Sequence, residues 1–187
     1  MAQYNKYVQV AHNTYMAFRD ATWGNGYNVD RKFGNQCWDF VDLLYWQYGR
    51  TLVTQAGGGS AADCWLLSRQ ANSQPPFISL VGKQNIKRGD ILVWNRSAIS
   101  SNGHIAFADE DYNGTNYIKS YGQNQGQGIY GPANVRNISL NNFLGIFRNT
   151  KWEGGGPTPP EPEPSKKSLK SKDFPWPVAW NNWPNFN

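Results

Sequence analysis

The chain has 187 residues, of which 39% are hydrophobic and 15% aromatic, and its formal net charge is +5. This length suits one domain plus an extension, and the apolar fraction is sufficient for a core that needs no disulfide or metal. No run of 18 or more apolar residues and no run of five basic residues occurs. We therefore expect neither a membrane nor a nucleic acid as partner. We also expect a monomer.

The cysteines and histidines are few and widely spaced. They are Cys37, Cys64, His12 and His104, and neither a Cys-x2-4-Cys nor a His-x3-5-His pair occurs. A structural zinc site is therefore not expected. The first twenty residues are polar and mixed, so we expect no signal peptide.

Hydrophobic periodicity predicts helices in the first half of the chain and strands in the second. The predicted helices cover residues 1–19, 36–48, where Gly49 ends the pattern, and 60–71, where Ser60 is the N-cap. Short aliphatic and aromatic runs at 90–94, 104–108, 116–121 and 143–147 predict strands. This order indicates an α+β fold in which N-terminal helices pack on an antiparallel sheet.

Cys37 is the first candidate for chemistry, because it lies where a Gly- and Asn-rich loop enters the second predicted helix. Unpaired N–H groups and the positive end of the dipole at a helix N-terminus favour the nucleophilic thiolate. The same N–H groups, together with the Gln36 side chain, would bind an oxyanion. The alternative interpretation is a small buried side chain.

His104 is the candidate general base, since it follows Gly103 at the start of a predicted strand and an imidazole titrates near neutral pH. The alternative is a hydrogen-bonded structural histidine. A polar residue after the next strand would orient the imidazole, and strand alternation places Ser120, Gly122 and Asn124 on one face. We interpret Cys64 as a core residue and His12 as a surface or helix-packing residue.

Four short motifs in this order resemble those of the CHAP family of cysteine, histidine-dependent amidohydrolases and peptidases. They are Gln36-Cys37-x-Asp39, Lys87-Arg88-Gly89-Asp90 with Trp94, Gly103-His104-Ile105-Ala106, and Gln123-Asn124. The resemblance implies a papain-like fold of NlpC/P60 type and a bacteriophage endolysin. It implies hydrolysis of a peptidoglycan amide bond, as N-acetylmuramoyl-L-alanine amidase or peptide endopeptidase.

The same resemblance implies roles for particular residues. Cys37 is the nucleophile, His104 the base, and Gln36 an oxyanion ligand. The family often carries an acid two residues before the late asparagine, where this chain has Gly122. Asn124 is therefore the expected third catalytic residue, with a water molecule or Gln123 as the alternative.

A structural calcium ion is a further implication, although the chemistry is expected to need no cofactor. Some phage CHAP domains carry acidic residues shortly before the cysteine and two residues after it. Here the corresponding residues are Asn28, Asp30 and Asp39, and their side-chain oxygens are of the type that calcium prefers. The alternative is that Asp39 caps the helix and that Asp30 is an ordinary loop residue.

Composition and resemblance together predict three segments: a CHAP catalytic domain at 1–152, a linker rich in Pro, Gly and Glu at 153–165, and a basic tail with three tryptophans at 166–187. We expect the tail to be disordered or a truncated wall-binding segment. A lysin without a signal peptide would be made in the host cytoplasm and reach the wall with a holin-type partner. The alternatives are a glycan-binding module without activity and a structural component of the phage tail.

Overall fold

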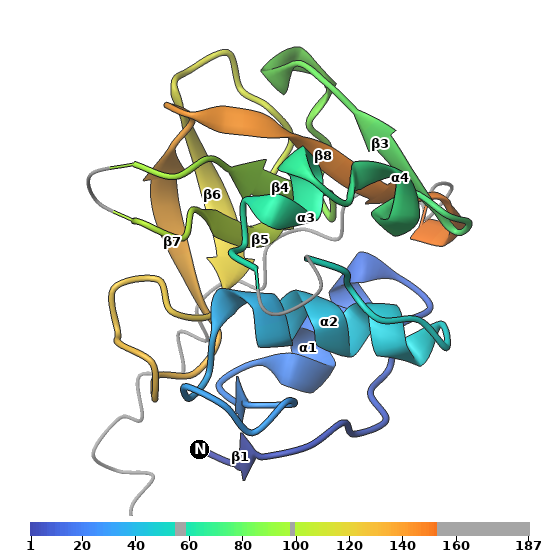
Figure 1. Ribbon diagram of the computed structural model, residues 1–187, viewed down its shortest axis with the longest axis vertical. Helices are drawn as coiled ribbons and strands as arrows, with labels where there is room; N and C mark the ends of the chain where they lie inside the picture. The colour runs from blue at the N-terminus through green and yellow to red at the C-terminus, as the bar shows by residue number, and fades with distance from the viewer. Residues whose placement is uncertain (55–58, 98–99, 153–187) are drawn as a thin grey trace, which may run out of the picture. The chain divides into compact units, whose positions relative to one another are not determined.

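The computed structural model describes residues 1–54, 59–97 and 100–152. The predicted linker and tail, residues 153–187, lie outside the described residues. Within the described part, two helices, α1 (Tyr15–Thr22) and α2 (Cys37–Gln47), precede most of the strands. Figure 1 shows these helices together on one side of the large sheet. The α+β class predicted from the sequence is confirmed.

The main sheet is antiparallel and has the strand order β3-β8-β4-β5-β6-β7. Its strands are β3 (Phe77–Leu80), β4 (Ile91–Trp94), β5 (His104–Ala108), β6 (Tyr117–Gly122), β7 (Asn134–Ser139) and β8 (Phe143–Asn149). The four predicted strands correspond to β4, β5, β6 and β8. The sequence analysis predicted neither β3 nor β7. β7 is mostly polar, so it lacks the apolar run on which the strand predictions depended.

The two faces of the sheet carry separate apolar clusters, as expected when side chains alternate along strands. One face presents Val93, Ile105 and Phe107 to Phe18 and Phe40 of the helices. The other face presents Leu92, Trp94, Ala106 and Ile118 to a smaller cluster. His104 lies on this second face, since it alternates with Ile105 and pairs with Trp94.

The helix predicted over residues 1–19 is wrong for its first fourteen residues. The helix begins only after Thr14, whose hydroxyl accepts the N–H of Ala17 at 3.0 Å. Before it, β1 (Gln3–Tyr4) pairs in parallel with β2 (Gly26–Tyr27), and the Tyr4 ring stacks on Tyr27. The aromatic residues of this segment therefore stabilise an extended arm. Their spacing is the one expected for a helix face, but they pack against other parts of the chain instead.

Of the other two predicted helices, one is confirmed and one is divided into two short helices. The prediction for 36–48 is confirmed by α2, which Gln36 precedes and Gly49, with a φ of +67°, follows. The predicted helix over 60–71 is divided into α3 (Asp63–Leu66) and α4 (Arg69–Asn72). Asp63 accepts N–H and O–H bonds from Ser60 and pairs with Arg96 at 2.7 Å, which fixes the start of α3 against the sheet. Two short 3-10 helices, Lys83–Asn85 and Thr150–Trp152, complete the described part.

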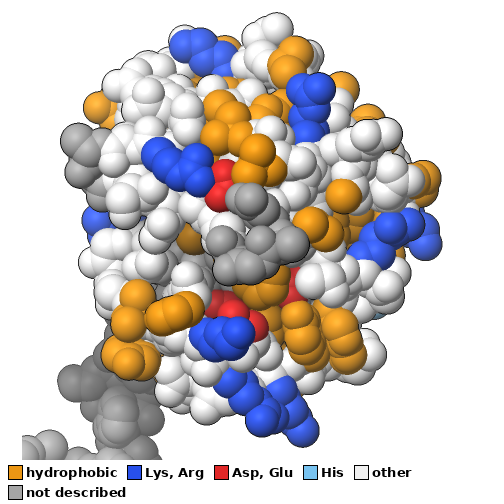
Figure 2. Space-filling model, in the orientation of Figure 1, with side chains coloured by type: hydrophobic (Ala, Val, Ile, Leu, Met, Phe, Trp, Pro, Cys, Tyr) orange, Lys and Arg blue, Asp and Glu red, His pale blue; other side chains and the backbone are white. Residues whose placement is uncertain are grey.

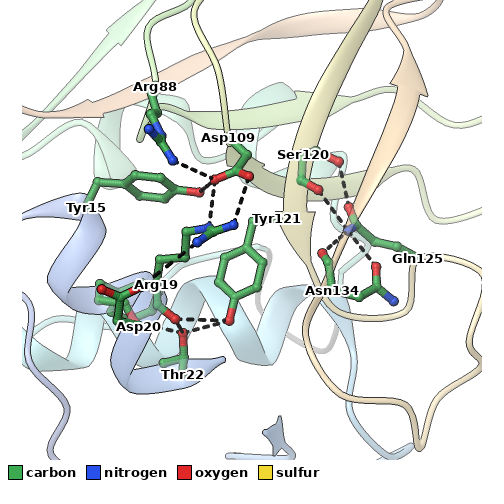
Figure 3. Close-up of polar contacts among 11 residues, drawn as sticks. Tyr15, Arg19, Asp20, Thr22, Arg88, Asp109, Ser120, Tyr121, Gln125 and Asn134 are labelled. Carbon is green, nitrogen blue, oxygen red and sulfur yellow. Dashed lines mark hydrogen bonds and ion pairs between the residues drawn. The ribbon is translucent and has the colours of Figure 1, made fainter. Parts of the chain in front are cut away.

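A buried carboxylate fixes α1 to the end of β5. Asp109 accepts the Tyr15 hydroxyl at 2.7 Å and pairs with Arg19 at 2.9 Å and Arg88 at 3.6 Å (Figure 3). With two guanidinium groups and a phenol, the charge of Asp109 is compensated, as a buried carboxylate requires. This cluster positions α1, and through it α2, against the strand that carries His104.

On the face viewed in Figure 2, most Lys and Arg side chains lie apart from one another among apolar and polar groups, and no large basic region is seen. A scattered distribution gives a weak field rather than a track for a polyanion. Among the described residues, no helix has the length and apolarity needed to cross a bilayer.

Candidate active site

Cys37 is the first residue of α2 and lies against the start of β5. The backbone N–H of Ile105 faces its sulfur, as do the N–H groups of Trp38 and of Cys37 itself. The residue before it is also fixed, because the Gln36 N–H donates to Asp39 Oδ2 at 2.9 Å. The thiol is half-buried at the junction of the loop, the helix and the strand.

The protonation of Cys37 differs from the sequence-based expectation. Burial raises the pKa of the thiol to about 11, and the three N–H groups offset only part of this effect. The cost of placing a charge in an apolar environment thus outweighs the helix N-terminus. Burial likewise lowers the pKa of His104 below its ordinary value. The resting site therefore holds a thiol and a neutral imidazole.

The imidazole of His104 is held by Gln125. His104 Nε2 and Gln125 Oε1 are 3.1 Å apart, and the imidazole also packs beside the Trp94 ring, with centroids 5.5 Å apart. Gln125 Oε1 additionally accepts the Ser120 hydroxyl at 2.8 Å. Figure 3 shows the Gln125 side chain next to Ser120 and Asn134.

The hydrogen bonds of Gln125 determine the tautomer of His104. Gln125 Nε2 faces the backbone carbonyls of Asn134 at 2.9 Å and Ser120 at 3.3 Å, which can only accept. This nitrogen is therefore the amide NH2, and the oxygen faces His104. His104 Nε2 must then carry the hydrogen, so that Nδ1 has the lone pair that can accept a proton. Among the described residues, no hydrogen bond joins the thiol and the imidazole directly.

Asn124, the expected third residue, makes no hydrogen bond with His104, whose partner is Gln125. It is exposed and adopts a left-handed backbone conformation with a φ of +54°. β6 ends at Gly122, so the strand alternation that would bring Asn124 to the face of Ser120 no longer applies. The turn returns Gln125 to that face instead. The Asn-x-Gly pattern of residues 124–126 is a turn signal that could have indicated this change.

Gly122 explains how Gln125 gains its place. A Cβ at position 122 would lie 2.9 Å from the Ala106 Cβ and 3.3 Å from Gln125 Oε1. A side chain at position 122 would therefore occupy the space that Gln125 uses. The glycine at the position where the family often carries an acid thus makes room for Gln125 beside His104.

The same turn also holds the nucleophile. Gln123 is fully buried, and its amide nitrogen donates to the carbonyls of Tyr27 at 2.8 Å and Gln36 at 3.0 Å. Its oxygen accepts the Tyr27 N–H at 2.6 Å. Gln123 therefore fixes the residue before Cys37, while Gln125 fixes His104. Two amides separated by one exposed residue position the two halves of the site.

A cleft of about 760 Å³ extends from His104 over the second face of the sheet. Trp94, Asn124 and Gln125 line it beside the imidazole, and Arg136 and Asn137 of β7 line it farther away. Cys37 is not among the residues that line it. The Gln36 side chain, expected to bind an oxyanion, donates to the Lys32 carbonyl at 3.3 Å, which leaves its second amide hydrogen for such a role.

The predicted calcium ligands come together only in part. Asp39 Oδ1 accepts the N–H groups of Val29 and Asp30, and its Oδ2 accepts that of Gln36, so the carboxylate closes the loop onto the helix. Asp30 Oδ1 accepts the N–H of Lys32, while Asn28 Oδ1 is buried without a partner. The described residues contain no group of three His, Cys, Asp or Glu side chains suited to a metal. Asp39 thus has the capping role that the alternative assigned to it.

Calcium binding stays a prediction that a thermal titration can test. Burial raises the pKa of Asp39 to about 7, and a bound cation would oppose this effect. A bound calcium ion would raise the melting temperature when millimolar calcium replaces EDTA, and Asp30→Asn would remove the increase. Equal melting temperatures in both buffers, with and without the substitution, would contradict calcium binding. The only role of Asp39 would then be to accept the backbone N–H groups of the loop.

The remaining cysteine and histidine lie where the sequence suggested. Cys64 is buried in α3, and burial raises its pKa well above the ordinary value. His12 packs edge-on against Tyr48, and its Nδ1 lies 3.0 Å from the carbonyl of Val10. Both are packing residues.

Comparison with known proteins decides the family. The CHAP domain model matches residues 23–124, more than half of the chain. The chain belongs to the CHAP family. The match ends one residue before Gln125, so the residue that holds His104 lies just outside the segment that defines the family here.

Two individual proteins extend this result. The chain is 31% identical over 128 residues to the D-alanyl-L-alanine endopeptidase of Streptococcus phage B30, a match that covers 67% of this chain and 27% of that protein. It thus spans about a quarter of the length of this curated relative. The endolysin LysIME-EF1 shares the CHAP chain's fold with a TM-score of 0.58 and 23% identity, over 78% of this chain and 67% of that one.

Proposed function

We propose that this CHAP chain is a peptidoglycan hydrolase of the phage-lysin type that cleaves a peptide bond by a thiol mechanism. What supports the proposal is that the Cys37 sulfur, at the start of α2, lies against the N–H of Ile105, the residue after His104 at the start of β5. Gln123 and Gln125 of one turn hold Gln36 and His104 in place. The name of the phage B30 relative favours the endopeptidase over the amidase, with the bond between D-alanine and L-alanine as the first candidate.

The mechanism begins from a neutral pair. His104 Nδ1 accepts the proton of the Cys37 thiol as the sulfur attacks the amide carbonyl, so the thiolate is formed during attack. The backbone N–H of Cys37 and the free amide hydrogen of Gln36 bind the developing oxyanion. His104 then protonates the leaving amine, and water hydrolyses the thioester. Gln125 keeps the hydrogen on Nε2 throughout, so that Nδ1 remains the reactive nitrogen.

The intact geometry makes a non-catalytic module or a tail component less attractive. A site that has lost its function has no need of two buried amides that keep the imidazole and the nucleophile loop in place. The protein would act on the bacterial wall, and we expect it to need no cofactor for the chemistry.

Mass spectrometry of fragments released from purified walls tests this proposal. New amino termini at L-alanine of cross-linked peptides, present with the wild type and lost with Cys37→Ala, would establish the endopeptidase. Release of lactyl-free stem peptides beginning at L-alanine of the stem would assign the amidase instead. No fragments from walls of several chemotypes would contradict the hydrolase.

A further inference from the structure

We infer that Arg136 forms a subsite for a free carboxylate on the amine side of the cleaved bond. The inference rests on the proposed function and specifies which part of a peptide substrate the cleft receives. Of the described residues that line the cleft, Arg136 alone carries a full charge, and its neighbours include Asn137 and Asn124. Amide groups suit a peptide backbone, whereas an unopposed guanidinium suits an anion.

The guanidinium has no partner within the part of the chain that the structure describes. Arg136 is exposed, and no ion pair or side-chain hydrogen bond engages it among residues 1–54, 59–97 and 100–152. By contrast, Arg19, Arg96 and Arg148 each pair with an aspartate. Arg136 is thus available to a ligand without breaking a contact of the fold.

The position of Arg136 is nevertheless well defined. It lies in β7 opposite Ser120 of β6, and its carbonyl accepts the Ser120 hydroxyl at 3.3 Å. A Cβ at Gly126, which has a φ of +83°, would lie 2.9 Å from Arg136 Nη2. Gly126 therefore leaves room for the guanidinium directly after the turn that supplies Gln125, on the same side of the sheet as His104.

Chemistry determines which half of the substrate lies there. In the proposed mechanism His104 donates its proton to the leaving amine, so the peptide attached to that amine must lie on the histidine side of the site. The cleft extends from His104 toward Arg136 on this side. Peptidoglycan peptides carry free carboxylates at terminal D-alanine and at isoglutamyl residues, and either would pair with a guanidinium.

The test compares matched substrates. Cross-linked muropeptide dimers would be prepared with all carboxylates free, with the terminal D-alanine amidated, and with the isoglutamyl carboxylate amidated. Arg136→Gln should lower kcat/KM about tenfold on the free dimer, as expected for one exposed charge-assisted hydrogen bond. On the dimer in which the bound carboxylate is amidated, Arg136→Gln should have no effect on kcat/KM. The dimer that shows this result identifies which carboxylate Arg136 binds.

Two controls separate this inference from the proposed function. Lys6→Gln removes one exposed positive charge outside the cleft and should leave all three rates unchanged. Calorimetry with Cys37→Ala, with and without Arg136→Gln, measures binding of the same dimers without hydrolysis. Equal effects of Arg136→Gln on every dimer, or no effect on any of them, would overturn the carboxylate subsite. Wild-type protein that binds the dimers but cleaves none of them would contradict only the proposed hydrolase activity.

Discussion

Cys37→Ala is expected to abolish wall hydrolysis, with a loss of at least about a thousandfold, while the protein stays folded. The thiol is the nucleophile that lies at the helix start against β5, and alanine keeps the α2 backbone and its N–H groups. The measurement is the rate of fragment release from walls, beside the melting temperature of the variant.

Cys64→Ala is the matched control, because it removes a sulfur from the same protein without touching the site. Cys64 is fully buried in α3, so its truncation should reduce the free energy of unfolding by about 1 kcal/mol and leave the activity of the folded protein intact. Activity in Cys37→Ala equal to that of the wild type would disprove the thiol mechanism.

Alkylation kinetics of Cys37 report its protonation. Because its pKa is raised to about 11, reaction with iodoacetamide should be slow at pH 7 and accelerate as the pH rises. Fast alkylation at pH 6 would instead reveal a thiolate paired with an imidazolium in the resting enzyme. Cys64, which is buried and has a higher pKa than usual, should react only after unfolding.

Gln125→Ala is expected to lower kcat about 10- to 100-fold with little change in KM, an effect of losing the partner that fixes the imidazole. Without Gln125 Oε1, the Nε2 hydrogen of His104 loses its acceptor, so the ring can rotate and change tautomer. Steady-state kinetics on a soluble cross-linked peptide separate kcat from KM.

Gln125→Glu provides a second measurement that a purely structural role would not affect. In the wild type the pKa of His104 is lowered, so the neutral base, and with it activity, persists below the pH at which an ordinary histidine gains a proton. A carboxylate on Nε2 would stabilise the imidazolium and raise this pKa. Activity of the variant should then fall at a higher pH than that of the wild type as the solution is acidified.

Asn124→Ala distinguishes the two candidates for the third residue. Asn124 is exposed and makes no hydrogen bond with His104, so its replacement should leave the acid limb of the pH profile unchanged. A shift of that limb in Asn124→Ala, together with an unchanged profile in both Gln125 variants, would restore the sequence-based assignment.

The comparison of sequence and structure is most instructive in the turn after β6. Strand alternation is a local rule. It places Ser120, Gly122 and Asn124 on one face only if the strand continues to residue 124. The left-handed φ of Asn124 ends that rule, and whether residue 124 or 125 reaches His104 depends on where the turn reverses. That point is set by two sets of contacts: Gln123 bonds to Tyr27 of β2, which lies far away in the sequence, and Gln125 bonds to Ser120 of β6 and Asn134 of β7, the strands on either side of the turn.

The protonation states of Cys37 and His104 likewise could not be predicted from neighbouring residues in the sequence. A helix N-terminus is visible in the sequence, and it argues for a thiolate. How deeply the sulfur is buried depends on how β5 packs on α2, and the desolvation this causes exceeds the local effect of the N–H groups.

The sequence by itself determined the α+β class, α2, four of the strands and the cysteine and histidine of the CHAP motifs. These features depend on periodicity, capping and short spacings, which act over a few residues. The tertiary structure alone decided the extended N-terminal arm, the polar strand β7, Gln125 as the partner of His104 and the unpaired Arg136 beyond it. Each of these depends on which distant side chains meet across the sheet, because burial and hydrogen-bond partners are properties of the packed chain.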